Sequence, residues 1–476
     1  MKTVKRRTFI KKSMLVSAGV ALGAPAYIKG YAQQQPSDIV NVAVAGINDR
    51  GGLYGGSGHT ANYTKIKESR VVALCDPVDY LFPKAIKDIE DLGGPKPKTV
   101  EDFRNLLDDK EIDAISIASP GYWHALMSIW ACQAGKDVYV EKPVSWSIDE
   151  GRKMVQAARK YNRIMQAGVN RRSNRVSLKA IELLRDGVIG DIYMGRYTVY
   201  RSRDSIGRVK DSPVPKGVNW DLFRGPAPMI PFNENHFLYK WHWYWDTSTT
   251  EFGNNGIHGI DRVRQAMNKN EHPVKVACCG GFYAYDSDQE VPNLEVATFE
   301  YADGSIIELE VRSLPTPGDT QGLLWLGTKG YAMLGNSFEA FVTGEKPVAA
   351  RTGQNPPVSA TGGRGSRGAP EPTLVITNED LPVDTRRDEL SKARIEYHFQ
   401  NFIDCVKSRK VEDLEADILE GHLSTSLCHL GNTAYRTGRK LTFDGKTEKY
   451  VNDKEANTYL ARPGGGRKPF NIPDKV

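Results

Sequence analysis

One short stretch, EFGNNGIHGID from Glu251 to Asp261, carries residue types suited to acid–base chemistry. It contains His258, with Asn254 four residues before it and Asp261 three residues after it. On a helix these spacings place all three side chains near one face. A neutral imidazole titrates close to working pH, so His258 could accept a proton from a substrate hydroxyl. The pattern also suits a buried histidine in a polar turn, and the stretch alone leaves both interpretations open.

A glycine-rich turn, GINDRG, follows the apolar run IVNVAVAG. A G-x-G-x-x-G turn between a strand and a helix binds the pyrophosphate of a dinucleotide. Asn48 stands at the middle glycine position, and asparagine is among the few residues that tolerate left-handed backbone. We therefore expect Gly46, Asn48, Arg50 and Gly51 to contact a cofactor.

The second apolar run, RVVALCD, is followed by an acid that suits ribose binding. An acid at this place accepts hydrogen bonds from ribose hydroxyls and favours NAD over NADP. Asp76 lies 30 residues after Gly46, which exceeds the usual spacing of about 20. The inserted segment Tyr54–His59 accounts for part of the difference. An ordinary turn with a helix-capping aspartate is the alternative interpretation.

These residues belong to a part of the chain where short apolar runs alternate with helical stretches. The runs are IVNVAVAG, RVVALCD, IDAISIASP, DVYVEKP and RIMQAGV, and their composition is typical of buried parallel strands. The helical stretches lie at 80–92, 100–109, 123–134 and 148–161. This α/β alternation predicts a Rossmann domain, a doubly wound parallel sheet, over residues 38–170.

After residue 170 the strand candidates become longer, and hairpin signals occur at Asp303-Gly304 and Lys329-Gly330. Two amphipathic helices follow near the end of the chain. We expect a C-terminal α+β domain with a large, mostly antiparallel open sheet over residues 171–450, then a tail at 451–476. The polar Pro/Gly/Ser segment 354–373 is expected to be a flexible surface loop.

The N-terminus has the layout of an export signal. Residues 1–32 contain a basic start with Arg6-Arg7, a short apolar run and small-residue cleavage candidates, which predicts a twin-arginine signal peptide. These residues hold seven Lys/Arg and no acid, so setting them aside lowers the formal charge from +6 to −1. The remaining charge gives no support for nucleic-acid binding. No run reaches the roughly 18 apolar residues of a permanent membrane span.

The six cysteines form no C-x-x-C pair, so no metal site is expected. KWHWYWDT, from Lys240 to Thr247, concentrates aromatic rings instead. On a strand, Trp241, Trp243 and Trp245 would share one face, and flat indoles suit the C–H faces of a pyranose. We assign these tryptophans to a carbohydrate subsite; a core or oligomer contact is the alternative.

At VYVEKPVSW the sequence resembles the Gfo/Idh/MocA oxidoreductase family, through Glu141-Lys142-Pro143 after a predicted buried strand. GINDRG, CDP, SPGYWHALMSIWACQAGKDVYVEKP and GIHGIDRVRQAM agree, and NFIDCVKSRK and EGHLSTSLCHLGNTAYRTGRKL look like its exported bacterial branch. The resemblance covers residues 39 to about 445. It implies an NAD(P)-dependent enzyme that acts on sugars, inositols or glycosides.

The resemblance implies catalytic roles for Lys142 and His258. An ammonium beside the reacting hydroxyl favours the alkoxide that forms as hydride leaves, and the histidine would be the general base. Family members place an aspartate four residues before this histidine, where this chain has Asn254. Asparagine can orient a hydroxyl, but it cannot stabilise an imidazolium by charge. We keep Asn254 among the catalytic candidates.

The remaining expected contacts lie at strand ends and near the histidine. Pro120 and His124, in SPGYWH, follow a predicted strand at the edge where cofactors bind. With Glu141 and Lys142 they complete the expected cofactor contacts. Arg171 and Asp261 are assigned to the substrate side, although we expect Asp261 to be structural.

The leading hypothesis is a periplasmic, NAD-dependent oxidoreductase that removes hydride from a sugar or glycoside. Twin-arginine export carries folded proteins, so the cofactor would be loaded first and held tightly. The alternative is glycoside hydrolysis by transient oxidation, elimination, water addition and re-reduction, with no net use of NAD. A non-catalytic sugar-binding protein is the third hypothesis. The resemblance also implies a homo-oligomer, a dimer or tetramer.

Overall fold

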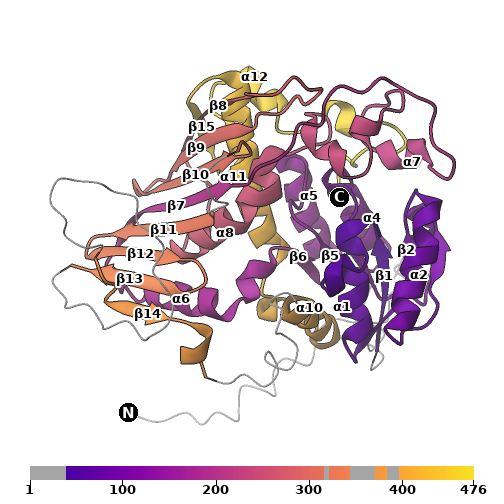
Figure 1. Cartoon of the computed structure of the whole chain (residues 1–476), viewed down its shortest axis with the longest axis horizontal. Coiled ribbons are helices and arrows are strands. Elements are labelled where there is room, and N and C mark those ends of the chain that lie inside the picture. The colour runs from indigo at the N-terminus through magenta and orange to yellow at the C-terminus, as the bar shows by residue number, and fades with distance from the viewer. Residues whose placement is uncertain (1–38, 316–320, 344–369, 383–395) are drawn as a thin grey trace, which may run out of the picture. The chain divides into compact units, whose positions relative to one another are not determined.

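The computed structural model describes residues 39–315, 321–343, 370–382 and 396–476, and Figure 1 shows their arrangement. The expected signal peptide and residues 354–369 of the expected loop lie outside the described residues. The described elements form two β-sheets with helices packed against them.

The first sheet is the predicted Rossmann sheet. Its strands are Val40–Ala45 (β1), Ser69–Cys75 (β2), Lys98–Val100 (β3), Ala114–Ile117 (β4), Asp137–Val140 (β5) and Met165–Ala167 (β6). All neighbouring pairs run parallel in the order β3-β2-β1-β4-β5-β6. The strand order reverses between β1 and β4, and in such sheets ligands bind at the carboxyl ends beside this point.

Helices cover this sheet on both faces, as the alternating pattern predicts. They are His59–Lys65 (α1), Phe82–Asp91 (α2), Arg104–Leu107 (α3), His124–Gln133 (α4) and Ile148–Lys160 (α5). Helix α5 begins where the Ser147 side chain accepts a hydrogen bond from the Glu150 amide, a regular N-cap. The sequence did not predict β3 or α1.

The second sheet is large and mostly antiparallel, as expected. Its order is β14-β13-β12-β11-β7-β10-β9-β8-β15-β16 in the described part of the chain. The strands are Ile192–Tyr200 (β7), Lys275–Gly281 (β8), Leu294–Glu300 (β9), Ile306–Arg312 (β10), Gln321–Gly327 (β11), Gly330–Leu334 (β12), Phe338–Val342 (β13), Leu374–Ile376 (β14), Leu441–Asp444 (β15) and Lys449–Tyr450 (β16). Only β7 and β10 pair in parallel among these strands. The fold class predicted from the sequence is therefore confirmed.

The helices of the second half join the two sheets. Two helices, Arg175–Arg185 (α6) and Ile257–Ala266 (α8), lie beside the second sheet. This half also contains two short helices, Trp220–Arg224 (α7) and Lys454–Thr458 (α12). Ile418–Thr437 (α11) contacts both α5 and β8, so it lies between the Rossmann elements and the second sheet.

Helix Glu396–Ser408 (α10) departs from the expected division at residue 170. Its Phe399, Phe402 and Ile403 are fully buried in one core with Val42 of β1 and Tyr63 of α1. Figure 1 shows α10 beside α1. The second half of the chain therefore supplies one of the covers of the Rossmann sheet.

Residues 451–476, expected as a tail, pack onto the rest of the protein. Phe470 and Ile472 are buried in the main core, and the Arg462 guanidinium pairs with Glu150 at 2.6 Å. Among the described residues, no helix combines the length and apolar content that crossing a bilayer requires.

Candidate active site

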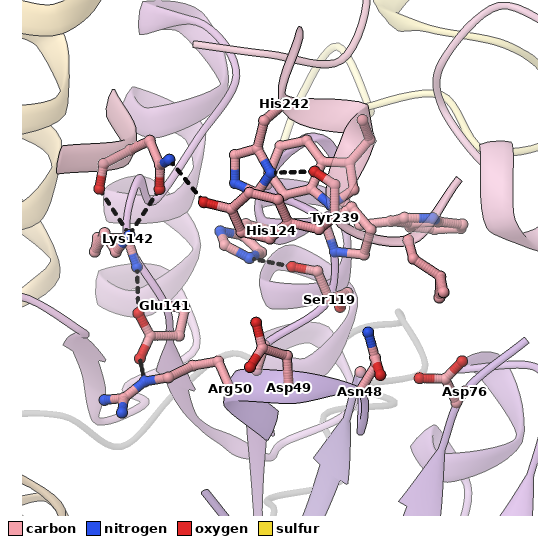
Figure 2. A pocket seen from close by; sticks show the side chains of 18 of the residues that line it. Asn48, Asp49, Arg50, Asp76, Ser119, His124, Glu141, Lys142, Tyr239 and His242 are labelled. Atoms are coloured by element: carbon pink, nitrogen blue, oxygen red, sulfur yellow. Dashed lines mark hydrogen bonds and ion pairs between the residues drawn. The ribbon is translucent and has the colours of Figure 1, made fainter. Parts of the chain in front are cut away.

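A cavity of about 420 Å³ lies where the carboxyl ends of β1, β2, β4 and β5 face loops from the second half of the chain. Figure 2 shows its wall, with Asn48, Asp49, Arg50 and Asp76 below and Lys142 and His242 above. All the expected catalytic and cofactor-binding residues line this cavity except Gly51.

The turn after β1 depends on its first and last glycines. Gly46 has φ +79°, and a Cβ there would lie 2.4 Å from the Ser119 amide nitrogen in the loop after β4. A Cβ on Gly51 would lie 1.6 Å from the Gly46 carbonyl oxygen. Glycine alone fits both places, so the loops after β1 and β4 meet at backbone distance.

The backbone conformation expected at Asn48 is found one residue later. Asn48 is extended, with φ −73° and ψ 147°, whereas Asp49 has φ +50°. The expectation that asparagine replaces the middle glycine by adopting left-handed backbone is therefore wrong. Asp49 takes that conformation, which aspartate also tolerates, and Asn48 lines the cavity in an ordinary one.

Glu141 ties the strand that carries Lys142 to the glycine turn. Its Oε1 accepts hydrogen bonds from Arg50 Nε at 2.9 Å and from buried His59 Nε2 at 3.1 Å. Burial opposes ionisation of Glu141, but the Arg50 charge and the His59 hydrogen bond hold its pKa well below the ordinary value. His59, which sequence reasoning missed, lies in the glycine-rich insertion and also contacts Ser116 Oγ at 2.8 Å.

Asp76 holds the start of the turn against β2. Its carboxylate accepts hydrogen bonds from the Ile47 amide at 2.9 Å and the Val78 amide at 3.0 Å. Burial raises the pKa of Asp76 to about 6, against the lowering effect of these amides. Asp76 lines the cavity, where the ribose contact is predicted, and its bonds to the two amides also match the alternative of an aspartate that stabilises the turn.

Lys142 links the two walls of the cavity. Its Nζ donates to the Asn254 carbonyl oxygen at 2.8 Å and lies 3.4 Å from Asn254 Oδ1, contacts that Figure 2 draws as dashed lines. Burial lowers the pKa of Lys142, partly offset by the charge of Glu141. The Lys142–Pro143 peptide is cis. Two catalytic candidates that lie far apart in the sequence, Lys142 and Asn254, are thus in direct contact through the Lys142 ammonium.

Asn254 and His258 project from a helix that changes geometry. Phe252–Gly256 is a π-helical turn that continues into α8, and such turns occur often at functional sites. Asn254 Nδ2 donates to Glu251 Oε1 at 3.1 Å and to the Tyr239 hydroxyl at 3.2 Å. Sequence reasoning missed Glu251. This buried residue supplies a carboxylate three residues before Asn254, the position where family members carry an aspartate.

His258 is neutral in this environment. Burial lowers its pKa well below the ordinary value, and the charges of Lys142 and Arg171 lower it further. Its Nδ1 is buried without a hydrogen-bond partner among the described residues. His258 as a residue lines the cavity, and a neutral imidazole there can accept a proton.

His124 lines the cavity as a clamp between loops. Its Nδ1 lies 2.7 Å from the Pro143 carbonyl oxygen, and its Nε2 lies 2.8 Å from the Ser119 carbonyl oxygen. Both ring nitrogens are occupied, so the side chain joins the loop after β4 to the loop that carries Lys142. Pro120, beside it, also lines the cavity.

The aromatic run is not a strand. Leu238–Trp243 forms a 3₁₀-helix, so alternating residues do not share a face. Trp241 lines the cavity, but Trp243 is buried with Tyr244 in a separate apolar cluster. Trp245 lies outside the cavity and stacks on Tyr435 with ring centroids 6.1 Å apart. The expected three-tryptophan subsite is thereby reduced to Trp241.

His242, which the strand pattern placed on the opposite face, lines the cavity. Its Nδ1 donates to the Tyr239 carbonyl oxygen at 2.7 Å, and its ring stacks on Trp241 at 3.6 Å. Burial lowers its pKa to about 3. The 3₁₀ geometry, which no sequence pattern predicted, brings His242 into the wall of the cavity.

Asp261 is a structural residue. Its carboxylate pairs with Arg172 Nε and Nη2, both at 2.8 Å, and accepts from Ser424 Oγ at 2.6 Å. It does not line the cavity, and the expectation that it binds substrate is wrong because these partners hold it in the core. Arg171, its companion in that expectation, does line the cavity.

A cluster of His272, His422 and Glu448 lies apart from the cavity residues. Both histidine Nε2 atoms lie 2.8 Å from Glu448 Oε1. Arg152 Nε also donates to this carboxylate, at 3.1 Å. A guanidinium therefore already meets the charge of Glu448, and the Nδ1 atoms of both histidines are buried without a partner among the described residues.

Comparison with known proteins agrees with this geometry. Residues 40–169 match the model of an oxidoreductase family with an NAD-binding Rossmann fold, and residues 201–318 and 382–472 match the C-terminal alpha/beta domain of the same family. Glycosyl hydrolase family 109 protein 2 of Shewanella sp. (strain ANA-3) is 29% identical over 208 residues, 40% of this chain and 44% of that protein. A glycosyl hydrolase family 109 protein of Shewanella baltica (strain OS195) is 25% identical over 292 residues, 57% and 56% of the two chains. The match spans about half the length of these curated relatives.

Solved structures share the fold. Aldose-aldose oxidoreductase from Caulobacter crescentus, complexed with glycerol, matches with TM-score 0.58 and 17% identity over 85% of this chain and all of that one. The WlbA dehydrogenase from Bordetella pertussis, in complex with NADH and UDP-GlcNAcA, matches with TM-score 0.59 and 17% identity over 85% and 99% of the two chains.

Proposed function

The chain belongs to the Gfo/Idh/MocA oxidoreductase family, and on that premise we propose that it oxidises a sugar or glycoside hydroxyl with NAD. The observation that carries the proposal is the contact of Lys142 Nζ with Asn254, in one cavity with His258 and the glycine turn. This arrangement places a proton donor and a proton acceptor at the end of the Rossmann sheet where nucleotides bind.

The residues present fit a dinucleotide. The glycine turn lies at the point where the strand order reverses, and Arg50 Nη2 is buried there without a partner among the described residues. Gly46, Asn48, Arg50 and Asp76 would hold the nucleotide, with His124 positioning the loop between them. When bound, NAD supplies a nicotinamide that accepts hydride from the sugar carbon.

The chain's own residues would handle the hydroxyl proton. His258 takes the proton on its imidazole, and the Lys142 ammonium stabilises the developing alkoxide. Asn254 keeps the ammonium directed into the cavity by accepting from Nζ. The ring of Trp241 offers an apolar face to the sugar.

The choice of NAD over NADP rests on Asp76. A carboxylate at the end of β2 accepts from ribose hydroxyls and repels a 2′-phosphate. Asp102 also lines this end of the cavity and adds negative charge.

Redox-neutral glycoside hydrolysis is the second candidate, because curated relatives are named glycosyl hydrolase family 109 proteins. That reaction uses the same nucleotide, Lys142 and His258, and returns the hydride after water adds. A neighbour in fold is named an aldose-aldose oxidoreductase, which suggests a second way to regenerate NAD in place. Non-catalytic sugar binding is the weakest candidate, since Lys142 and His258 are both placed for chemistry.

Export and assembly belong to the same proposal. Arg6-Arg7 and the apolar run after them support folded export to the periplasm through the twin-arginine pathway. A cofactor loaded before export and retained afterwards fits a site that lies between the Rossmann strand ends and loops of the second half. The large open sheet is the face through which we expect a dimer or tetramer to form.

The test uses protein purified after export, with no cofactor added, on a panel of glycosides with products analysed by mass spectrometry. A product two hydrogens lighter, with NADH absorbance at about 340 nm, supports the oxidoreductase. Free sugar without net NADH supports the redox-neutral hydrolase. No product and no nucleotide released on denaturation would contradict both.

A further inference from the structure

The half of the cavity built by the second part of the chain is positively charged. Arg171, Arg201 and Arg203 line it, and Lys142 faces them from the Rossmann side. The acidic side chains that line the cavity all come from the Rossmann half, among the described residues: Asp49, Asp76, Glu101, Asp102 and Glu141. The two halves therefore differ in the sign of their charge.

One carboxylate, that of Glu251, lies behind this wall, and its oxygens already accept hydrogen bonds from neighbouring side chains. Glu251 accepts hydrogen bonds from Arg203 Nε at 3.1 Å and Asn254 Nδ2 at 3.1 Å, and also from Asn255. It does not line the cavity in the described part of the chain. Glu251 thus offsets the charge of Arg203 from behind the wall.

Arg201 is the cation with most freedom to bind a ligand. Its side chain is exposed at the cavity and donates no hydrogen bond to any described residue, whereas its backbone amide is fixed by Arg312 of β10 at 2.8 Å. Lys142 contacts only the neutral oxygens of Asn254. A guanidinium on a fixed backbone, with its fork open, matches a carboxylate, sulfate or phosphate.

The same cations disfavour protonation of His258. Burial, Lys142 and Arg171 together hold its pKa down, so the imidazolium formed during catalysis would lie among like charges. A negative group on the bound ligand would relieve this repulsion at the moment the proton arrives.

We propose that the substrate is an anionic sugar, whose carboxylate, sulfate or phosphate is bound by Arg201 with Arg171 while its hydroxyl meets Lys142 and His258. The inference rests on the proposed function, since it names the substrate class of that site. In uronic acid derivatives the carboxylate is part of the sugar itself, attached directly to the pyranose ring.

Calorimetry of the NAD-saturated protein with matched ligands tests this without turnover. Methyl glucuronide is compared with methyl glucoside, and glucose 6-sulfate and glucose 6-phosphate with glucose. The charged member should bind about tenfold tighter or more at low salt, and the preference should shrink as salt is raised. The arm with the largest ratio identifies the anion.

Variants locate the effect. Arg201→Gln should lose about tenfold in affinity for the charged ligand and nothing for its neutral partner, and Arg201→Lys should retain part of the preference. Arg439→Gln is the matched control, because Arg439 is exposed and pairs with Asp453 and Glu455. Equal binding of charged and neutral partners, or an Arg201→Gln variant with unchanged preference, would overturn the inference.

The outcomes also separate this inference from the proposed function. Neutral glycosides oxidised as well as charged ones would overturn the anionic substrate and leave the oxidoreductase intact. A charged sugar that binds through Arg201 but undergoes no chemistry would support the subsite and contradict the oxidoreductase.

Discussion

Lys142 is the residue whose loss should affect chemistry most and binding least. Lys142→Met removes the ammonium that Asn254 holds 2.8 Å from its carbonyl oxygen while keeping the side-chain volume. We expect kcat to fall by about 10² to 10⁴, with sugar affinity by calorimetry changed less than about tenfold. Lys87→Met, on the exposed ion pair with Asp91, is the control. Undiminished turnover in Lys142→Met would remove Lys142 from the mechanism.

Asp76 makes cofactor binding depend on pH. Its pKa is raised to about 6, so the carboxylate gains a proton as pH falls below 6 and loses the charge that suits ribose hydroxyls. We expect the Kd for NAD to rise between pH 7 and pH 5, by at most about tenfold per pH unit. Calorimetric titration of NAD across this range measures it.

Stability depends on pH in the opposite direction from NAD affinity. The folded protein binds this proton more tightly than the unfolded chain, so the contribution of Asp76 to stability is present at low pH and is lost as pH rises through about 6.

Asp76→Asn should flatten the pH dependence of NAD binding. A wild-type curve as flat as that of the variant would exclude Asp76 as the ribose contact.

Asn254 is explained by its neighbour. Asn254 Nδ2 lies 3.1 Å from Glu251 Oε1, so an aspartate there would set two carboxylates against each other and lose a donor. Asn254→Asp should destabilise the protein by about 1–3 kcal/mol and lower kcat. Adding Glu251→Gln should recover most of the loss, measured by thermal unfolding and turnover. An Asn254→Asp variant as stable as wild type would contradict this account.

Among the site residues, the sequence predicts those that directly follow strands. It does not predict those whose position depends on local helix geometry. Gly46, Asp76 and Lys142 follow predicted strands, and parallel strands bring their carboxyl ends together. Trp243 and Trp245 were misplaced because a 3₁₀-helix replaces the expected strand. Glu251 was missed because its pairing with Arg203 joins residues 48 apart.

Helix α10 is the element whose packing makes the two halves of the chain interdependent. Phe402 is fully buried and contacts the rings of Tyr63 and Tyr139, with centroids 6.5 and 5.9 Å away. Phe402→Ala should cost about 3–5 kcal/mol of unfolding free energy, measured by urea denaturation. Lys407→Ala, on the same helix, should change little. A Phe402→Ala protein of wild-type stability would show that α10 does not hold the Rossmann sheet.

Long periodic elements were predictable, and short ones were not. Helices α2, α4 and α5 and strands β1, β2 and β5 match their apolar patterns. Strand β3 has only 3 residues, and α1 is a helix of 7 residues that begins at the end of the glycine-rich insertion. The amphipathic pattern of α10 predicted a helix but could not show which sheet it covers, because that depends on contacts between residues far apart in the sequence, as between Tyr63 and Phe402.

For the whole molecule, the proposal joins export to cofactor retention. Replacing Arg6 and Arg7 with lysine should keep the protein in the cytoplasm, because the twin-arginine pathway requires the pair. Wild-type protein from the periplasm should release about one nucleotide per chain on denaturation, measured by chromatography of the supernatant. Periplasmic protein that releases none would show that the cofactor is not carried through export.

Transfer of hydride from the sugar to the nucleotide is the step that defines the proposed activity, and it can be followed directly. The protein is mixed in a single turnover with a glycoside that it processes, deuterated at each ring carbon in turn, then quenched and its nucleotide analysed by mass spectrometry. The account predicts deuterium in the nicotinamide from one carbon only, and loss of that signal in Lys142→Met. Product formed from every labelled sugar with no deuterium in the nucleotide would contradict it.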